Sequence, residues 1–341
     1  MGILLTVGIF YIAAHILVFL PAARRSFPRL CQNAAPVFLV CDSMLAGVLL
    51  LELYFAAIHD QSDGFNLTRS GRQWFERHWK PVNSLGYRDA EPAAPAPGQR
   101  TIMILGDSFA AGHGIERAEN RFSDVAARVL GPGWKVYNVS QPGWDTVDEA
   151  KAMRAFPVKP DVVVLCYYLN DVFHAANEAK YPLAFSVNLP TGFTKQLIGV
   201  SALADYVYWR LARGGNLSGG AGTFWDTLKG AYADPAVWGI HAKALGDIAA
   251  YCRENRIALV AVVFPMLQAP AESAPITGKV ATALADMGAD VIDLTPAMQG
   301  RPARELVVNA LDAHPNEAVH RQVGEMLAGR MREMESSLAQ R

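Results

Sequence analysis

The sequence predicts an α/β fold built on a five-stranded parallel sheet, with two membrane-spanning helices in front of it. Three observations lead to this prediction. Short apolar runs alternate with helical patterns from about residue 100 onward, which is typical of a parallel sheet covered on both faces. Residues 3–22 and 34–58 are apolar stretches close to the ~20 residues that span a bilayer. A proline- and alanine-rich linker, residues 91–98, separates the two parts.

Length and composition exclude some classes of function. The 341 residues suffice for one large α/β domain with additional segments. The formal net charge of −1 gives no electrostatic reason to expect a nucleic-acid partner. The four cysteines lie far apart and form no metal-binding spacing. The cysteines therefore give no indication of a metal site.

Residues 1–60 are predicted to form a two-helix transmembrane anchor. Three arginines follow the first apolar stretch, whereas a signal peptide would begin with positive charge; they are Arg24, Arg25 and Arg29. The positive-inside rule places this arginine linker in the cytoplasm. Everything after residue 60 then lies outside, on the periplasmic side of the cell membrane. The alternative is a soluble protein in which both stretches are buried core helices.

Two acidic residues interrupt the second apolar stretch. Asp42 and His15 both lie about 10 Å from the cytoplasmic end of their helices, so we expect them to pair within the hairpin. Glu52 is nearer the outer face, where it can snorkel or meet an envelope protein partner. A transport or relay role for these acids is the alternative.

Residues 61–100 form a polar connector. Residues 62–66 are interpreted as a loop, and residues 83–89 as a structured turn. A short helix over residues 69–79 places its aromatic side chains on one side; they are Trp74, Phe75 and Trp79. We expect this aromatic patch to pack the connector onto the main domain or the membrane surface.

The main domain is expected at residues 101–341. The predicted strands are 101–106, 134–139, 161–168, 257–264 and 290–294, and the predicted helices are 119–130, 146–155, 240–255, 277–287 and 315–336. Pro315 is expected just inside the start of the last helix. Residues 171–239 are a long, aromatic-rich insert, either a lid or a packed subdomain. Within it, residues 201–213 predict an amphipathic helix and residues 214–222 a mobile glycine-rich loop.

Ser108 is the candidate nucleophile. The buried strand 101–106 stops at Gly106-Asp107-Ser108, and a turn with Gly112 and Gly114 follows. A small side chain thus sits at the carboxyl end of a strand, the edge at which open α/β sheets bind ligands. We expect Asp107 to fix the turn and to have no catalytic role.

Polar residues also follow the other strands, and their types fit acyl transfer. His314 can act as the base for Ser108, and Asp312 can orient that base. The backbone N–H groups of Ser108 and Gly143 and the side-chain amide of Asn170 are candidate donors to an oxyanion. In the alternative readings, Gly143 is only a turn glycine and Asn170 caps the following helix. His113 could line the pocket.

These clusters together resemble the SGNH (GDSL-type) hydrolase superfamily. Gly106 to Gly112 is similar to its nucleophile block, Gly143 to its glycine block, Asn170 to its asparagine block, and Asp312 with His314 to its final block. The resemblance covers about residues 100–335. It implies a flavodoxin-like three-layer sandwich, a Ser–His–Asp triad, and ester hydrolysis or acyl transfer without metal or cofactor.

One position departs from the commoner family pattern, which has the acid three residues before the histidine. Leu311 occupies that position here, and Asp312 lies two residues before His314. The shorter spacing is what the resemblance implies for members that act on acetyl groups of exopolysaccharides, so Asp312 remains the candidate. Without it, a backbone carbonyl would orient the histidine and the site would be a dyad.

The predicted function is that of a membrane-anchored extracytoplasmic serine esterase. Its substrate would be an O-acyl group, such as O-acetyl, on a cell-envelope glycan or a lipid. The same triad would make an O-acyltransferase if a sugar hydroxyl replaced water. A different class of protein is also open, a catalytically idle glycan-binding domain of an envelope assembly. A thioesterase or lysophospholipase is a further alternative.

Overall fold

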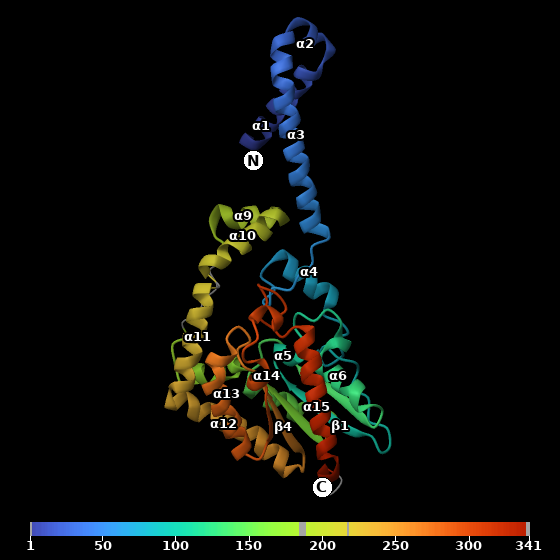
Figure 1. Cartoon of the computed structure of the whole chain (residues 1–341), viewed down its shortest axis with the longest axis vertical. Helices are drawn as coiled ribbons and strands as arrows, with labels where there is room; N and C mark the ends of the chain where they lie inside the picture. The colour runs from blue at the N-terminus through green and yellow to red at the C-terminus, as the bar shows by residue number, and fades with distance from the viewer. Residues whose placement is uncertain (1, 184–188, 217, 339–341) are drawn as a thin grey trace. The chain divides into compact units, whose positions relative to one another are not determined.

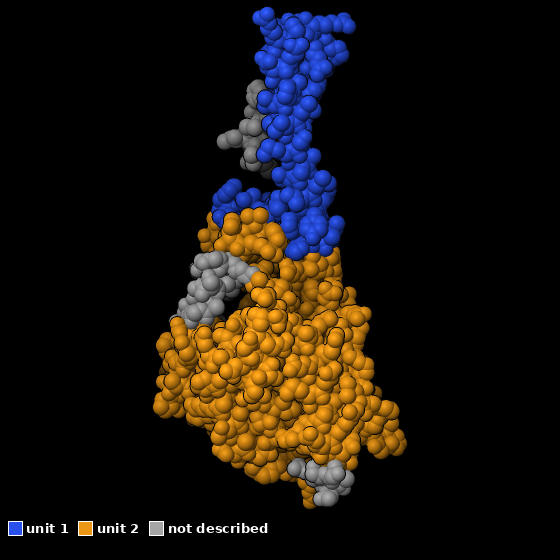
Figure 2. Space-filling view, viewed as in Figure 1, with its two compact units in different colours: residues 1–59, 193–205 blue, residues 60–192, 206–341 orange. Residues whose placement is uncertain are grey.

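The computed structural model describes residues 2–183, 189–216 and 218–338 of the chain. The chain divides into two compact units (Figure 2). The first unit comprises Met1–His59 and Phe193–Asp205, and the second comprises Asp60–Gly192 and Tyr206–Arg341. The connector therefore belongs to the second unit, whereas residues 193–205 of the insert belong to the first.

Five parallel strands form the sheet of the second unit, in the order β2-β1-β3-β4-β5 (Figure 1). The strands are β1 Arg100–Gly106, β2 Trp134–Ser140, β3 Val162–Tyr167, β4 Ala258–Val263 and β5 Asp290–Asp293. The predicted five-stranded parallel sheet is therefore confirmed. Gly106, the last residue of β1, pairs with Ser140 of β2 and with Cys166 of β3. The segments that follow these three strands consequently start at the same edge of the sheet.

Helices cover both faces of the sheet and make it the middle of three layers. Successive side chains of a strand point to opposite faces, and β1 follows this rule. Met103 and Leu105 belong to one buried cluster, with residues of α7, α12 and α13. Ile102 and Ile104 belong to the other, with residues of α6 and α15. These helices are α6 Phe122–Leu130, α7 Thr146–Ala155, α12 Pro235–Glu254, α13 Pro270–Asp286 and α15 Glu317–Leu338.

Shorter elements complete the second unit. They are α4 Arg69–His78, α5 Ser108–Ala111, α8 Phe173–Glu178, α11 Ser218–Ala233, α14 Thr295–Met298 and the 3₁₀ turns Ala118–Asn120, Leu169–Val172 and Ala303–Glu305. The insert contains two further helices, α9 Gly192–Val200 and α10 Ala202–Asn216. Apart from Gly192, α9 belongs to the first unit, whereas α10 begins in the first unit and continues in the second.

Several helices begin at other residues than the sequence predicts. α12 starts five residues earlier, because Asp234 caps it by accepting hydrogen bonds from the N–H groups of Ala236 and Val237. α15 starts at Glu317, because Asn316 caps it by accepting from the N–H of Val319. Pro315 therefore precedes the helix instead of lying inside it.

The insert is largely helical where the structure describes it. The expected helix over residues 201–213 corresponds to α10. The expected glycine-rich loop over residues 214–222 is wrong, because the backbone there belongs to α10 and α11; residue 217 and residues 184–188 lie outside the described residues. Trp225, Leu228 and Tyr232 of α11 are buried in the core. Their packing outweighs the low helix propensity of the preceding glycines.

The first unit contains three N-terminal helices, α1 Gly2–Phe19, α2 Pro21–Ser26 and α3 Pro28–Ala57. Among the described residues, α3 is the one helix that is long and apolar enough to cross a membrane, with a mean hydropathy of 2.1 over its most apolar stretch. None of the residues in that stretch is buried. A two-pass hairpin remains a proposal.

His15 and Asp42 lie close together within this unit. His15 Nδ1 is 3.5 Å from Asp42 Oδ2. Tyr11 of α1 donates a hydrogen bond to Asp42 Oδ1 at 2.7 Å, a contact that the sequence analysis did not foresee. Phe38 of α3 packs against the rings of Tyr11 and His15. The carboxylate of Asp42 on α3 thus has polar partners on α1.

Candidate active site

Ser108 lies directly after β1, at the carboxyl edge of the sheet. Asp107 caps the short helix α5, and its Oδ1 accepts a hydrogen bond from the N–H of Phe109 at 2.8 Å. Burial raises the pKa of Asp107, although the Phe109 N–H and His314 work against this rise. Asp107 thus fixes the turn that presents Ser108, as the sequence analysis expects.

Ser108, His314 and Asp312 form a continuous chain of polar contacts. Ser108 Oγ lies 2.8 Å from His314 Nε2, and His314 Nδ1 lies 2.5 Å from Asp312 Oδ1. Asp312 Oδ1 also accepts a hydrogen bond from the backbone N–H of His314 at 3.0 Å. With a spacing of two residues, a single carboxylate oxygen therefore contacts both the backbone and the ring of the histidine.

The electrostatics suit a base that is oriented by a carboxylate. Burial alone would raise the pKa of Asp312, but charge and hydrogen bonding from His314, His113 and Ser62 hold it well below its ordinary value. Burial alone would lower the pKa of His314, yet the Asp312 charge and hydrogen bond raise it above its ordinary value. Asp312 is therefore ionised at neutral pH and favours the protonated imidazole that forms during proton transfer.

The three candidate oxyanion donors follow three neighbouring strands, β2, β1 and β3. Gly143 has a φ of +83°, a left-handed conformation that favours glycine. Asn170 Nδ2 donates a hydrogen bond to Asp107 Oδ2 at 3.2 Å. This side chain therefore contacts the nucleophile turn, and Tyr168 instead of Asn170 is the residue at the cap of the 3₁₀ turn. An amide has a second N–H, which remains for a substrate oxygen.

The connector reaches the same carboxylate from its other side. Ser62 is buried, and its hydroxyl donates a short hydrogen bond to Asp312 Oδ2. Asn309 Nδ2 in turn donates to the carbonyl of Ser62 at 2.9 Å. Gly64 has a φ of +77°, and a Cβ there would lie 3.1 Å from Asp312 Oδ1 and 3.4 Å from His314 Nδ1. Residues 62–64 are thus a loop, as the sequence predicts, and they form one wall of the site, which the sequence did not predict.

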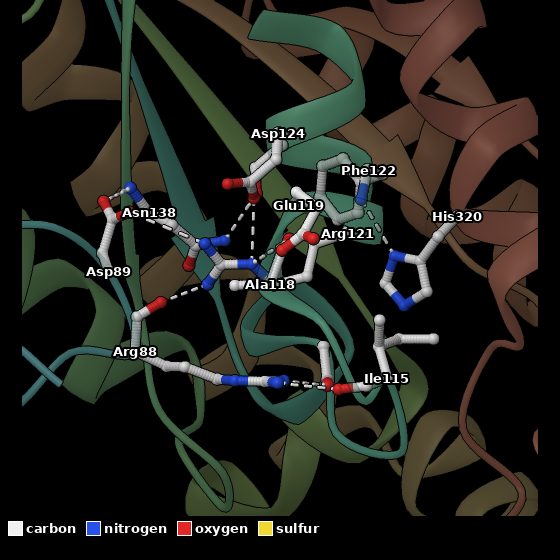
Figure 3. Close-up of polar contacts among 12 residues, drawn as sticks. Arg88, Asp89, Ile115, Ala118, Glu119, Arg121, Phe122, Asp124, Asn138 and His320 are labelled. Carbon is white, nitrogen blue, oxygen red and sulfur yellow. Dashed lines mark hydrogen bonds and ion pairs between the residues drawn. The ribbon is translucent and has the colours of Figure 1, made fainter. Parts of the chain in front are cut away.

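A second connector contact holds the turn that follows Ser108 (Figure 3). The buried guanidinium of Arg88 donates hydrogen bonds to the carbonyls of Gly112, Ile115 and His78, each at 2.7 Å. Arg121 donates a short hydrogen bond to the carbonyl of Arg88. Burial, and to a smaller extent Arg121, lower the pKa of Arg88 to about 9, so it stays charged at neutral pH.

Asp89 extends this contact to β2. Its Oδ2 accepts a hydrogen bond from the N–H of Asn138 at 2.8 Å, and its Oδ1 lies 3.6 Å from a guanidinium nitrogen of Arg121. The expected structured turn at residues 83–89 is therefore joined to β2 and to the residue that precedes α6.

His113 packs flat against the ring of His314, with the ring centroids 4.8 Å apart. Burial, followed by the nearby His314, lowers the pKa of His113 to about 3. It is neutral at neutral pH and cannot compete with His314 as a base. The rings of Trp74 and Trp79 also lie against His113, with centroids 5.4 and 5.8 Å away, so the aromatic patch of the connector packs onto this part of the domain.

No local signal in the sequence marks Ser62 or Gly64. A Ser-Asp-Gly run has the composition of an ordinary turn, and its contact with Asp312 joins residues 250 positions apart. For Arg88, the available signal was its place within the predicted turn at residues 83–89. Among the residues that the structure describes, no group of three or more His, Cys, Asp or Glu side chains is arranged to hold a metal ion.

Comparison with known families decides the class of the protein. Residues 104–322, more than half of the chain, match the model of the GDSL-like lipase/acylhydrolase family. The chain belongs to this family. The resemblance found in the sequence is therefore confirmed, and the matched segment contains Ser108, Gly143, Asn170, Asp312 and His314. Membership in this family makes the protein a hydrolase that acts on ester bonds.

Solved structures provide distant similarities. The carbohydrate acetylesterase family member from Sinorhizobium meliloti is 14% identical, with 69% of this chain and 99% of that chain covered and a TM-score of 0.39. The lipase/acylhydrolase from Enterococcus faecalis is 15% identical, covering 70% and 97% with a TM-score of 0.41. The psychrotrophic esterase EstA from Pseudoalteromonas sp. is 13% identical, covering 69% and 98% with a TM-score of 0.41. A comparison with curated protein sequences finds no match.

Proposed function

We propose that this GDSL hydrolase is a membrane-anchored serine esterase whose active site lies outside the cytoplasmic membrane. The chain of contacts from Ser108 Oγ through His314 to Asp312 carries the proposal, because these distances are those of a nucleophile, its base and an orienting acid. The substrate is an O-acyl group, such as O-acetyl, on a cell-envelope glycan or a lipid.

The reaction proceeds in two transfers. His314 Nε2 takes the hydroxyl proton of Ser108 as Oγ attacks the ester carbonyl, and the negative charge moves to the carbonyl oxygen. The N–H groups of Ser108 and Gly143 and the amide of Asn170 stabilise this oxyanion. His314 then protonates the leaving alcohol, which departs as the acyl-enzyme forms. Water attacks the acyl-enzyme with His314 again as base, and the acid is released while Ser108 regains its proton.

The helix α3 supports the location and the class of substrate. It exposes large apolar side chains along its length, including Leu39, Met44, Leu50 and Leu53, and such a surface is costly in water and stable in lipid. Three arginines lie just before α3 or in its first turn, Arg24, Arg25 and Arg29, and by the positive-inside rule they favour a cytoplasmic position for that end. An esterase domain held on the outer side meets acylated polymers and lipids of the envelope.

Labelling with a fluorophosphonate serine probe tests the catalytic part of the proposal. We expect membranes that contain the full chain to be labelled, and Ser108→Ala and His314→Ala to lose the label. Ser84→Ala, which alters an exposed serine of the connector, is the matched control and keeps the label. Labelling that persists in Ser108→Ala would refute the assigned nucleophile. An unlabelled but folded wild-type protein would instead favour a glycan-binding domain without catalysis.

Cysteine labelling tests the topology separately. In a Cys41→Ser background, a membrane-impermeant maleimide added to intact cells should modify Ser84→Cys, whereas Ala22→Cys in the arginine linker should react only after lysis. The opposite pattern, or labelling of both sites in intact cells, would contradict an extracytoplasmic active site.

A further inference from the structure

The N-terminal end of helix α10 is bound directly to the apolar helix α3 through Glu52. Ser201 Oγ donates a hydrogen bond to Glu52 Oε2 at 2.7 Å. The N–H groups of Ala202 and Leu203, the first two of α10, donate to the same carboxylate at 2.6 and 3.1 Å. These residues belong to one compact unit with α3 (Figure 2). Glu52, which we expected from the sequence to snorkel or to meet a protein partner, thus fixes the start of α10 to α3.

The chemistry of this contact is that of a helix cap supplied by another helix. The first N–H groups of a helix have no partner within it, and its N-terminus carries a partial positive charge. Glu52 satisfies two of these groups and brings a carboxylate to the positive end, while Ser201 Oγ accepts from the N–H of Ala204 at 3.0 Å. The contact therefore holds residues 201–204 in a defined position along α3.

That position corresponds to the boundary of a bilayer. Glu52 lies five residues before Ala57, the last residue of α3, which is about 8 Å along the helix axis. The whole of α3 is about 45 Å long, comparable to a bilayer with its headgroup regions. If α3 spans the membrane, Glu52 and the start of α10 lie at the outer headgroup level.

The helix α9, which immediately precedes this contact, has an exposed apolar face. Phe193, Leu197 and Val200 are 77%, 42% and 78% exposed, and their spacing of four and three residues places them on one side of a helix. Lys195 lies about 200° around the helix from Phe193, so its charge is on the opposite side. Apolar side chains on one face and a basic residue on the other are typical of helices that lie in a membrane interface.

We propose that α9 and the start of α10 form an interfacial helix pair whose apolar face inserts into the outer leaflet of the lipid bilayer. This inference deepens the proposed function, on which it depends for the membrane span of α3. Continuity with the lipid-exposed surface of α3 selects lipid as the occupant, because Glu52 fixes this pair at the end of that surface. The insert then has two tasks, since α11 packs into the esterase core while α9 rests on the membrane.

Depth-dependent fluorescence quenching tests the proposal on the full chain in nanodiscs. In a Cys41→Ser background, an environment-sensitive dye is attached to Val200→Cys on α9, to Leu49→Cys on α3, or to Lys243→Cys on α12. Lys243 is a solvent-exposed residue of the esterase domain and is the matched control. The lipids carry bromine either near the headgroup or deep in the acyl chain.

We expect Val200→Cys to be quenched at least twofold more by shallow than by deep bromine, and Lys243→Cys not to be quenched by either. Leu49→Cys should be quenched by acyl-chain bromine, which reports on the span of α3 alone. If Leu49→Cys is quenched and Val200→Cys is not, the interfacial helix is refuted while the anchor stands. If Leu49→Cys is not quenched, the anchor itself fails. A Val200→Cys dye shielded from water but unquenched by lipid identifies a protein partner or a second copy, and refutes the proposal.

Glu52→Gln tests the contact that positions the pair. Glutamine retains the shape of the side chain but has one acceptor oxygen and no charge, so it cannot serve both N–H groups of α10 equally. We expect the shallow quenching of the Val200→Cys dye to fall at least twofold, whereas Glu254→Gln on the exposed face of α12 leaves it unchanged. Hydrolysis of a soluble ester in the same sample reports that the esterase domain remains folded. Quenching that is unchanged in Glu52→Gln would refute the role of this contact.

Discussion

Two segments on opposite sides of Asp312 and His314 complete the candidate active site in different ways. The turn after β1 supplies Ser108, whose Oγ contacts the imidazole at 2.8 Å. The connector supplies Ser62, whose hydroxyl binds the far oxygen of the carboxylate, and Gly64, whose backbone lies against both residues. In the proposed mechanism, the first segment thus carries the reacting atom, whereas the second supports the groups that activate it.

This difference separates chemistry from positioning. Loss of a reacting group removes a reaction path, and loss of a supporting contact changes only how often the remaining groups are aligned. Substitutions of the reacting group should therefore lower kcat by orders of magnitude. Substitutions in the supporting segment should lower kcat far less, and should mainly alter its pH dependence or the stability of the fold. The connector directly follows α3 in the chain, so the segment that leaves the proposed membrane anchor also supports the carboxylate of the site.

The largest effect is expected where the two segments converge, at Asp312 itself. Asp312→Asn keeps the shape of the side chain but removes the charge that favours protonated His314, and kcat for a soluble ester should fall by about 10⁴-fold. The decrease in kcat is measured by steady-state hydrolysis of a soluble ester with the full chain in detergent. Asp247→Asn on the exposed side of α12 is the control. A loss below tenfold would favour a dyad in which a backbone carbonyl orients the histidine.

The next largest effect is expected on the free energy of unfolding, when Arg88 of the connector is replaced. Arg88→Met leaves the carbonyls of Gly112, Ile115 and His78 without their buried donor, which should lower the free energy of unfolding by about 3 kcal/mol. Urea denaturation of the esterase domain, followed by tryptophan fluorescence, measures the change. Arg128→Met, at an exposed arginine, should change it by less than about 0.5 kcal/mol. Equal effects of the two substitutions would show that the connector does not hold this turn.

Gly64→Ala separates backbone strain from contact with the site. Gly64 and Gly98 have nearly the same positive φ, +77° and +79°, but only at Gly64 would a Cβ lie against Asp312 and His314. Both substitutions should cost about 1 kcal/mol of stability. Only Gly64→Ala should also lower kcat, by about tenfold, because the carboxylate must move. A similar kcat in both variants would mean that the site absorbs the extra methyl group.

Features that depend on local sequence pattern were predictable, whereas features that depend on tertiary contacts were not. The sheet, its strands and Ser108 were predictable because apolar runs and strand-end placement depend on local pattern and on the common edge of a parallel sheet. The helix starts at Asp234 and Asn316 were missed because capping depends on which polar side chain turns back to the backbone. Ser62 was not predictable, since its role exists only once residues 62 and 312 are brought together by packing.

The insert was harder to predict for a related reason. Glycine propensity favours a loop at residues 214–222, but tertiary packing of Trp225 and Leu228 makes α11 a helix. Likewise, Glu52 was recognised as a polar residue in an apolar helix, but its partner on α10 could not be derived from any spacing.

The smallest effect, and the sharpest test of the comparison, is expected for Ser62→Ala. The proposed mechanism requires neutral His314, so the wild-type rate should rise with pH through the pKa of His314, which Asp312 raises above the ordinary 6.5. Without the Ser62 donor, the Asp312 carboxylate shares its charge with fewer partners and attracts the protonated imidazole more strongly. The pKa of His314 should then rise further, and the acid limb of the kcat profile should move to higher pH. On the plateau, kcat should fall about fivefold, equivalent to about 1 kcal/mol, with KM unchanged.

Ser84 lies in the same connector, but its hydroxyl donates to Glu91 and not to the site. Ser84→Ala therefore controls for general loosening of this segment and should leave the profile unchanged. If Ser62→Ala lowers kcat without moving the acid limb, Ser62 only stiffens the connector. If neither quantity changes, Asp312 is held sufficiently by His314 and its own backbone, and the second wall of the site has no part in catalysis. A shift of the acid limb to lower pH would contradict the prediction. It would mean that the Ser62 hydrogen bond raises the pKa of His314 instead of lowering it.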